Sequence, residues 1–399
     1  MACTGPATRQ PVSARPQEIP LGLYVHFPWC VRKCPYCDFN SHPLNQELPE
    51  AAYVSALVAD WQAQRSDTSN SNTRDRKIGS VFFGGGTPSL FSPSSFAKLI
   101  EQFADQLTED AELTMEANPG TLEYGNLDEY RSAGINRLSM GVQSFADSAL
   151  EALGRIHSAD EARTAIEAAQ LGGFKNINVD LMHGLPNQTT ASALNDLQCA
   201  IALNVQHISW YQLTIEPRTE FAKRPPTLPE EETLGEIESE GLTLLADAGF
   251  DRYEISAYAR DGKQSKHNRN YWEFGDYIGL GAGAHGKLTQ LDTRSFGVTR
   301  TAHPRQPRLY LQQADNNQWQ LESQAVAPDQ LPGEFMMNAL RLVGGVAEEL
   351  YEQTTGQSLK DIEKQLSRWR SMGVIDADRL ALTPMGLNVL DTVVADFLV

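Results

Sequence analysis

LGLYVHFPWCVRKCPYCDFNSH, residues 21–42, joins an apolar run directly to three closely spaced cysteines. The run Leu21–Phe27 predicts a β-strand. Cys30, Cys34 and Cys37 follow it as C-x3-C-x2-C, in the loop that leaves the carboxyl end of that strand. Special side chains at the carboxyl ends of strands are typical of α/β folds with one active face. This stretch therefore predicts both the start of the fold and the place of a functional site.

The same arrangement recurs along the chain. Each further apolar run is followed by a turn rich in Gly, Pro or Asn and then by a helix-like amphipathic stretch. These runs are Ser80–Phe83, Leu113–Ala117, Arg137–Val142, Ile177–Met182, His207–Ile215 and a shorter candidate at Tyr253–Ala257. Such a rhythm predicts βα units and a parallel sheet. Six or seven units in one domain favour an α/β fold with a complete or partial (β/α) barrel, with an open doubly wound sheet as the alternative.

Unusual residues gather where these runs end. HFPWC follows the first run, GGGTPS the second, EANPGT the third, GVQSF the fourth and HGLP the fifth. Because the carboxyl ends of parallel strands meet at one face of a barrel, these motifs are expected to lie together.

The pattern changes after about residue 290. Two helix-like segments, Pro332–Leu342 and Ser358–Met372, precede a strand–turn–strand pattern over residues 373–384. A final helix is expected over Met385–Leu398. Helices followed by a β-hairpin predict a small helical, winged-helix-like domain.

The charge balance argues against several classes of protein. With 33 Lys and Arg against 51 Asp and Glu, the net charge is −18. A field of this sign repels phosphate backbones, so nucleic acid is not an expected partner. No stretch approaches the roughly 18 consecutive apolar residues of a membrane span, and residues 1–20 lack a signal-peptide core. We therefore expect a soluble, cytoplasmic protein without a transmembrane segment.

The three clustered cysteines predict a bound metal. Thiolates this close together repel one another unless they share a ligand. One possibility is a structural zinc ion completed by His26 or His42. The other is a [4Fe–4S] cluster, which four cysteines normally hold, so that three would leave one iron open to a small molecule. The spacing favours the cluster, since paired C-x2-C motifs are more typical of zinc.

Here the sequence resembles a known family. The cysteine spacing, with Tyr36 directly before the third cysteine, is similar to that of the radical S-adenosylmethionine (SAM) enzymes. The resemblance implies a partial (β/α) barrel and a [4Fe–4S] cluster whose open iron chelates SAM. It also implies an electron donor as a partner, because reduction of the cluster leads to cleavage of SAM and release of a 5′-deoxyadenosyl radical.

The resemblance further implies a SAM pocket at the strand ends. Gly84–Pro88 resembles the glycine-rich turn that receives the methionine amino group, and glycine allows a ligand to approach the backbone closely. Carboxylates suit the ribose hydroxyls, and arginine suits the methionine carboxylate. The matching positions are Tyr24, Tyr36, Gly85, Gly86, Thr87, Glu116, Gln143, Arg155, Asp180 and Gln212.

Longer matches narrow the resemblance to one branch. EANPGT, GINRLSMGVQSF, LGRIHS, HISWYQLTIEP and GLGAGAHG resemble the branch that contains oxygen-independent coproporphyrinogen III oxidases and the HemW-type haem chaperones. Residues 1–19 mix Pro, Ser, Thr and Arg without periodicity, which predicts a disordered arm. The resemblance covers roughly residues 20–395 and implies a radical SAM core barrel with the cluster loop over 20–290 and a C-terminal HemN-like domain over 291–399.

Two features favour the haem chaperones within this branch. Oxidases of the branch carry a further cysteine two residues after the third cluster cysteine, whereas this sequence has Phe39. His267–Trp272, HNRNYW, resembles the HNxxYW motif that HemW-type proteins associate with haem binding, so His267, Tyr271 and Trp272 are candidate haem contacts. His157, His183, His207 and His285 lie in similarly distinctive motifs, so the iron ligand is left open.

The leading hypothesis is therefore a haem chaperone that binds haem and transfers it to apo-haemoproteins. The cluster and SAM would serve assembly, release or formation of a homodimer, and no coproporphyrinogen oxidase activity is expected. The alternatives are the oxidase itself and a radical enzyme that acts on an unrelated substrate.

Overall fold

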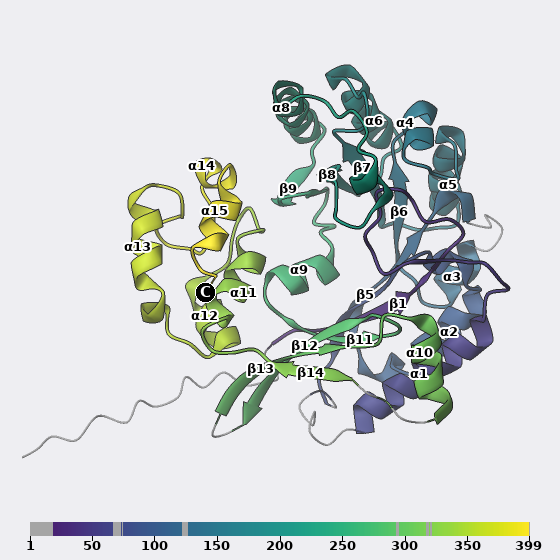
Figure 1. Cartoon of the computed structure of the whole chain (residues 1–399), viewed down its shortest axis with the longest axis horizontal. Coiled ribbons are helices and arrows are strands. Elements are labelled where there is room, and N and C mark those ends of the chain that lie inside the picture. Colours follow the sequence, from purple (N-terminus) through teal and green to yellow (C-terminus); the bar gives the residue numbers. More distant parts are fainter. Residues whose placement is uncertain are drawn as a thin grey trace, which may run out of the picture.

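The computed structural model describes residues 19–66, 73, 75–121, 127–292, 295–316, 319 and 321–398 (Figure 1). The disordered arm expected over residues 1–19 lies outside these residues, except for Ile19. Ile19 is buried, and its carbonyl oxygen accepts a hydrogen bond from Arg76 Nη2 at 2.6 Å. The ordered barrel thus begins one residue before its predicted start.

The core of the molecule is a curved sheet of 12 strands whose central seven strands are parallel (Figure 1). In spatial order these are β11 (Asp276–Leu280), β1 (Leu21–Phe27), β4 (Ile78–Gly85), β5 (Leu107–Ala117), β6 (Arg137–Gln143), β7 (Ile177–His183) and β8 (His207–Gln212). From β1 to β8 the order follows the chain without reversing, unlike a doubly wound sheet. Among the described strands the two ends of this order do not pair. The predicted partial barrel is confirmed.

Helices cover the outer face of the parallel strands, which bury side chains on both of their faces (Figure 1). These helices are α1 (Glu50–Ser66), α2 (Pro93–Glu101), α3 (Leu127–Ser132), α4 (Asp147–Ala152), α5 (Ala159–Leu171), α6 (Thr190–Ala202) and α8 (Glu231–Asp247). The short α7 (Glu220–Lys223) instead contacts the cysteine loop, where the Phe221 amide donates a hydrogen bond to the Pro35 carbonyl oxygen at 3.0 Å. The local sequence determines where two of these helices begin, since Ser158 and Thr189 form capping boxes at the N-termini of α5 and α6. Short 3₁₀ turns occur at Pro88–Leu90, Ala104–Gln106, Pro119–Thr121 and Leu359–Asp361.

Antiparallel strands extend both edges of the parallel sheet. Beyond β8 lie β10 (Ala257–Ala259) and β9 (Asp251–Glu254), which divide the single strand expected at Tyr253–Ala257. Beyond β11 lie β12 (His285–Asp292), β13 (Ser295–Ala302) and β14 (Glu322–Ala325), and α10 (Pro307–Asn316) packs on α1. The sequence pattern did not predict β11 to β14. The expected boundary at residue 290 falls inside β12, and the same sheet continues to residue 325.

A buried ion network holds β11 beside β1. Asp276, at the start of β11, receives Arg76 Nη1 at 2.7 Å and Lys287 Nζ at 3.1 Å, and all three side chains are buried. Burial alone would raise the pKa of Asp276, but Lys287 and Arg76 hold it below its ordinary value. Removing one partner from such a network leaves an unpaired buried charge, which costs about 3–5 kcal/mol.

The C-terminal region is helical, and its apolar core also includes Tyr253, Ala257, Ala259, Phe274 and Val298 from the edges of the sheet. It contains α11 (Leu331–Ala339), α12 (Glu348–Thr355), α13 (Glu363–Ser371), α14 (Pro384–Leu387) and α15 (Leu390–Ala395), of which α12 was not expected. Isolated bridges join Ile375 to Leu382 and Val346 to Leu380, where a hairpin was expected. Phe335, Tyr351 and Leu366 are central to its core. Among the described residues, no helix is both long and apolar enough to cross a bilayer.

Candidate functional site

The cysteine loop leaves the carboxyl end of β1 between two very short parallel strands, β2 (Trp29–Cys30) and β3 (His42–Pro43). Lys33 Nζ donates hydrogen bonds to the carbonyl oxygens of Phe39 at 3.0 Å and Ser41 at 3.3 Å. The Cys37 amide donates to the Cys34 carbonyl at 3.1 Å, which makes a turn between the second and third cysteines. The loop is therefore folded by its own contacts.

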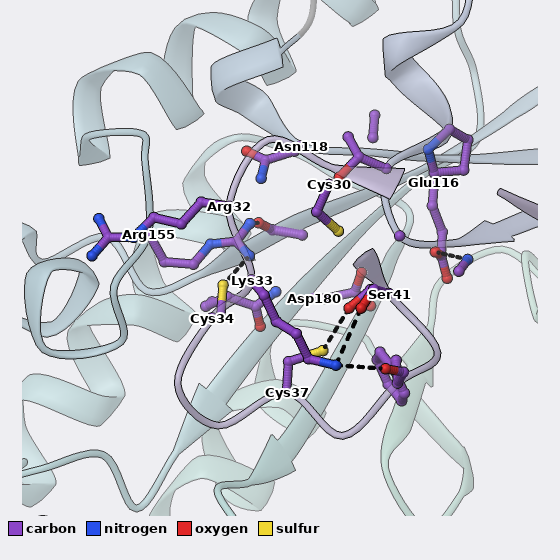
Figure 2. A pocket seen from close by; sticks show the side chains of 18 of the residues that line it. Cys30, Arg32, Lys33, Cys34, Cys37, Ser41, Glu116, Asn118, Arg155 and Asp180 are labelled. Atoms are coloured by element: carbon purple, nitrogen blue, oxygen red, sulfur yellow. Dashed lines mark hydrogen bonds between the residues drawn. The ribbon is translucent and has the colours of Figure 1, made fainter. Parts of the chain in front are cut away.

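Three free thiols face one space within this loop (Figure 2). Arg155 Nη1 lies 3.6 Å from Cys34 Sγ, and Ser41 Oγ lies 3.6 Å from Cys37 Sγ. Burial raises the pKa of the Cys30 thiol. A nearby guanidinium favours thiolates, and thiolates are the ligands of iron–sulfur clusters. The donor set thus fits the cluster that the spacing predicts.

The zinc alternative receives less support from the geometry. Across the described parts of the chain, no three His, Cys, Asp or Glu side chains lie close enough to hold a single metal ion. His26, one proposed fourth ligand, uses both ring nitrogens: Nε2 contacts the Asn40 carbonyl oxygen at 2.9 Å and Nδ1 contacts the Tyr24 hydroxyl at 3.0 Å. His42 is partly buried, and its Nε2 has no hydrogen-bond partner among the residues that the structure describes.

A cavity of about 300 Å³ adjoins the three thiols, and we call it the cysteine cavity. It brings together side chains from the ends of β4, β5, β6, β7 and β8. Of the positions predicted for SAM, it is lined by Tyr36, Gly85, Gly86, Thr87, Glu116, Gln143, Arg155 and Asp180. Motifs that are far apart in the sequence therefore meet at one face of the barrel, as the βα pattern predicts.

The glycine turn leaves backbone exposed to this cavity. Gly85 has φ +117°, and a Cβ there would lie 2.5 Å from the His26 ring. A Cβ on Gly86 would lie 2.5 Å from the carbonyl oxygen of Trp29. Any side chain at either position would clash, so only glycine allows the loop and the strand end to pack this closely. Such a turn suits the backbone contact predicted for a SAM amino group.

Two partly buried carboxyl groups, Glu116 and Asp180, form the inner wall of the cysteine cavity. Glu116 Oε2 accepts the Gly85 amide hydrogen bond at 2.9 Å, and Asp180 Oδ1 accepts one from Asn178 Nδ2 at 2.8 Å. Burial, with the charge of Asp180 nearby, raises the pKa of Glu116 to about 8, and burial also raises that of Asp180. Glu116 is therefore mainly protonated at neutral pH, so it can both donate and accept hydrogen bonds.

Arg155 and Gln143 complete the far wall. Arg155 Nη2 donates to the Gly141 carbonyl oxygen at 2.5 Å, which holds its guanidinium between β6 and the cysteines (Figure 2). Gln143 has φ +71°, and its Oε1 accepts a hydrogen bond from the Tyr211 hydroxyl at 2.9 Å. Tyr211 lines the cavity, whereas Gln212, predicted from the sequence, is exposed and does not. Neighbouring strand residues point to opposite faces, which explains why Tyr211 rather than Gln212 lines the cavity.

A second cavity, of about 750 Å³, adjoins the first, and we call it the aromatic cavity. The two cavities share Phe39, Gly85 and Glu116. The aromatic cavity is lined by Tyr24, His26, Asn40, Tyr271, Tyr277, Gly283, His285, Ala302, His303, Pro304, Arg305 and Glu322 as well. Tyr24, predicted for SAM, lines this second cavity rather than the first.

The haem motif of the sequence lies on α9 (Lys266–Trp272), which Ser265 caps. Only Tyr271 of the three predicted contacts lines the aromatic cavity. His267 is 2% exposed and packs between rings, 4.7 Å from Phe82 and 4.6 Å from Tyr271 between centroids. Trp272 lies against the Arg341 guanidinium instead. His267 is thus a core residue of α9, because an amphipathic helix buries one face.

The chain also resembles known proteins over most of its length. Residues 24–199 match the Radical SAM superfamily, and residues 326–389 match the HemN C-terminal domain. It is 46% identical to heme chaperone HemW of Haemophilus influenzae over 387 residues, 96% of this chain and 99% of that protein. It is 45% identical to heme chaperone HemW of Escherichia coli, over 95% of this chain and 98% of that one.

A solved structure supports the same fold. Coproporphyrinogen III oxidase (HemN) from Escherichia coli superposes with a TM-score of 0.78 at 23% identity, covering 96% of this chain and 91% of that one. The superfamily implies a [4Fe–4S] cluster and SAM, for which the cysteine loop and the cysteine cavity provide a fitting donor set. With relatives of 45–46% identity over nearly its whole length, the chain belongs to the HemW family of the radical SAM superfamily.

Proposed function

We propose that this protein is a haem chaperone, which carries a [4Fe–4S] cluster and SAM, binds haem and passes it to apo-haemoproteins. The observation that carries the proposal is the aromatic cavity beside the cofactor site, in a chain whose relatives are named heme chaperones. Its volume of about 750 Å³ lies within the roughly 300–1,000 Å³ of small-molecule sites. Flat, aromatic-lined cavities suit a porphyrin, which is large, flat and apolar.

Within the cysteine cavity we assign cofactor roles to this chain's own residues. Cys30, Cys34 and Cys37 would hold the cluster. The SAM contacts would come from Tyr36, Gly85, Gly86, Thr87, Glu116, Gln143, Arg155 and Asp180. When bound, the cluster supplies the electron for reductive cleavage of SAM, and a separate electron donor would reduce it.

Charge and burial suit these roles. The Arg155 guanidinium offsets the negative charge of the thiolates beside it. Glu116 and Asp180 are partly buried, and hydrogen bonds to ribose hydroxyls are stronger there than in open water. The Gly85–Gly86 turn leaves room for close contact with the backbone. These residues bind and orient a cofactor next to the aromatic cavity.

Phe39 favours the chaperone over the oxidase. It occupies the position at which the oxidases of this branch carry a further cysteine, and it lies on the wall shared by the two cavities. An aromatic ring there adds apolar surface for a porphyrin. The experiment that tests the proposal must also distinguish the chaperone from the oxidase and from a radical enzyme with an unrelated substrate.

The proposal is tested with anaerobically reconstituted, cluster-loaded protein. We expect near-stoichiometric haem binding in an absorbance titration, and transfer of that haem to an apo-haemoprotein. With reductant and SAM, coproporphyrinogen III should remain unconverted. Conversion to protoporphyrinogen would identify the oxidase instead, and deoxyadenosine formation without haem binding would indicate an unrelated radical enzyme.

A further inference from the structure

His285 is the most solvent-exposed histidine among the described residues. The sequence contains eight histidines, and all eight lie among the described residues. Six are at most 7% exposed: His26, His157, His183, His207, His267 and His303. His42 is partly exposed and lies outside the aromatic cavity. His285 is exposed and lines that cavity.

The exposure of His285 matters because a haem iron must reach a nitrogen lone pair. Three of the buried histidines, His26, His157 and His207, use both ring nitrogens inside the fold. His183, His267 and His303 each keep one ring nitrogen without a hydrogen bond among the described residues, but these nitrogens are buried. His207, for example, pairs with Asn178 Oδ1 at 2.6 Å and the Tyr253 hydroxyl at 2.9 Å. His157 pairs with Asn118 and with the Val142 carbonyl oxygen. No side-chain hydrogen bond of His285 occurs within the part of the chain that the structure describes.

The backbone presents His285 from a fixed point. It is the first residue of β12 and lies opposite Ala302 of β13, whose small side chain leaves space beside the ring. A Cβ on Gly279 would lie 2.2 Å from the His285 carbonyl oxygen, so β11 and β12 pack very closely here. Lys287 and Thr289, on the same face of β12, are buried. These buried side chains and the close contact with β11 fix the position of β12, and with it the point from which the His285 side chain extends.

The electrostatic surroundings keep this imidazole neutral. Burial, together with the positive charges of Arg300 and Arg305, lowers the pKa of His285. A neutral imidazole keeps the lone pair that a metal binds. The tyrosines of the cavity are poorer ligands, since burial raises the pKa values of Tyr24, Tyr271 and Tyr277 and keeps them as phenols. Their rings instead provide faces on which a porphyrin packs.

Arg305 lies at the rim of the aromatic cavity, where haem would expose its propionates. Its side chain is exposed, and its carbonyl oxygen accepts a hydrogen bond from Asn40 Nδ2 at 3.0 Å. Two acids share the cavity lining, Glu116 and Glu322. Glu116, with a pKa of about 8, carries little charge at neutral pH, so Glu322 is the acid that opposes Arg305. A local arginine is needed because the net charge of −18 repels an anionic ligand.

We propose that His285 is the axial ligand of the haem iron in the aromatic cavity, and that Arg305 binds a haem propionate at its rim. This inference rests on the proposed function, because it gives the site of the haem that the chaperone carries. Ligation leaves the oxidation state of the iron unchanged: the imidazole lone pair replaces a water molecule on the iron. The geometry also places haem beside the cofactor cavity, across a wall of Phe39, Gly85 and Glu116.

The test titrates haem into cluster-loaded protein and follows the absorbance and electron paramagnetic resonance of the haem iron. In His285→Ala we expect the histidine-ligated spectrum to be lost and the affinity to fall by about tenfold or more. Added imidazole should restore the histidine-type spectrum. Arg305→Ala should keep the wild-type spectrum and weaken binding roughly two- to fivefold. Gln290→Ala, an exposed position on the same strand outside the cavity, serves as the matched control.

The outcomes separate this inference from the proposed function. Wild-type protein that binds no haem would overturn both. Wild-type protein that binds haem, together with a His285→Ala variant of unchanged spectrum and affinity, would overturn the inference alone. His267→Gln checks the competing ligand: if this variant retains its circular dichroism and cluster content but loses the histidine-type spectrum, the ligand is His267 and the inference is wrong.

Discussion

The cysteine cavity and the aromatic cavity share a wall but are built in different ways. The cysteine cavity joins the loop after β1 to the ends of successive strands from β4 to β8. The aromatic cavity joins β1 and that loop to the segment from α9 to β14. One is therefore assembled from repeated βα units and the other from the irregular edge of the sheet. Local motifs reveal a site of the first kind, whereas the second kind emerges only in the folded chain.

The two cavities also differ in chemistry. The cysteine cavity contains thiols, a guanidinium and partly buried carboxyl groups, which suit a charged cofactor. The aromatic cavity offers mainly rings, with one accessible imidazole and one rim arginine. If each cavity holds its own ligand, variants in one should leave the ligand of the other in place. The following predictions test that independence.

The largest effect is expected for the cluster ligands. Cys30→Ala, Cys34→Ala and Cys37→Ala should each abolish the iron–sulfur absorbance and lower the iron and sulfide content to near zero, because each removes a thiolate ligand. Haem binding should persist in all three. Cys199→Ala, in α6, is the control and should keep a full cluster. A full cluster in all three variants would refute the assignment of the cluster ligands.

A large loss of SAM binding is expected for Gly86→Ala. The new Cβ would lie 2.5 Å from the Trp29 carbonyl oxygen and 2.9 Å from that of Phe27, and neither backbone atom can move easily. Such overpacking costs about 1–3 kcal/mol of stability. Equilibrium dialysis should show a fall in SAM affinity of about tenfold. The control Gly79→Ala, also at a β4 glycine but with open space around it, should bind SAM normally.

An intermediate effect, on the pH dependence of the free energy of unfolding, is expected when Glu116 on the shared wall is replaced. Its folded pKa of about 8 exceeds the ordinary value of 4.5, so the folded protein keeps this proton over a range in which the unfolded chain has lost it. The free energy of unfolding should therefore decrease as pH rises through this range. In Glu116→Gln this pH-dependent decrease in the free energy of unfolding, on the order of a few kcal/mol, should be absent. Denaturant unfolding at about pH 5.5 and about pH 8 measures this, since each pKa unit is worth about 1.4 kcal/mol.

The exposed Glu101→Gln variant on α2 is the control for that experiment and should keep the wild-type pH dependence. An unchanged pH dependence in Glu116→Gln would mean that Glu116 ionises normally in the fold.

The smallest effect is expected for Phe39→Ala. Phe39 is 67% exposed, so its loss should change the free energy of unfolding by less than about 0.5 kcal/mol. Its ring nevertheless lines both cavities, and a lost aromatic contact of about 0.5–1.5 kcal/mol weakens haem binding roughly two- to tenfold. Titration of haem into the variant, beside a melting curve, measures both. Unchanged haem affinity would remove Phe39 from the haem site.

The barrel and the cysteine cavity could largely be predicted from the sequence. Strands β1, β4, β5, β6, β7 and β8 are short apolar runs in a regular βα rhythm, and their ends carry the distinctive residues. Gly85 and Gly86, predicted as SAM contacts, line this cavity because their motif lies at the end of β4, and the LGRIHS motif after α4 brings Arg155 to the same face. Gln212 does not line the cavity, because every second residue of a strand faces the same side, and an apolar run such as HISWYQ does not reveal which residues those are.

The edge strands and the aromatic cavity could not be predicted in this way. β11 begins at Asp276, whose charge can be buried in a core strand because Arg76 and Lys287 pair with it. Periodicity does not detect such compensation. His267 looked like a ligand because its motif is distinctive, yet α9 buries it, whereas His285 emerges only when β12 and β13 pair. Exposure, which decides whether an imidazole can bind iron, is a property of the fold.

The independence of the two cavities is tested most directly by recording absorbance spectra of Cys37→Ala and His285→Ala, each reconstituted anaerobically and titrated with haem. We predict that Cys37→Ala loses the cluster spectrum and keeps the histidine-ligated haem spectrum, whereas His285→Ala keeps the cluster spectrum and loses the haem ligation. Loss of both spectra in either correctly folded variant, or a wild-type haem spectrum in His285→Ala, would contradict an account with two separate ligand sites.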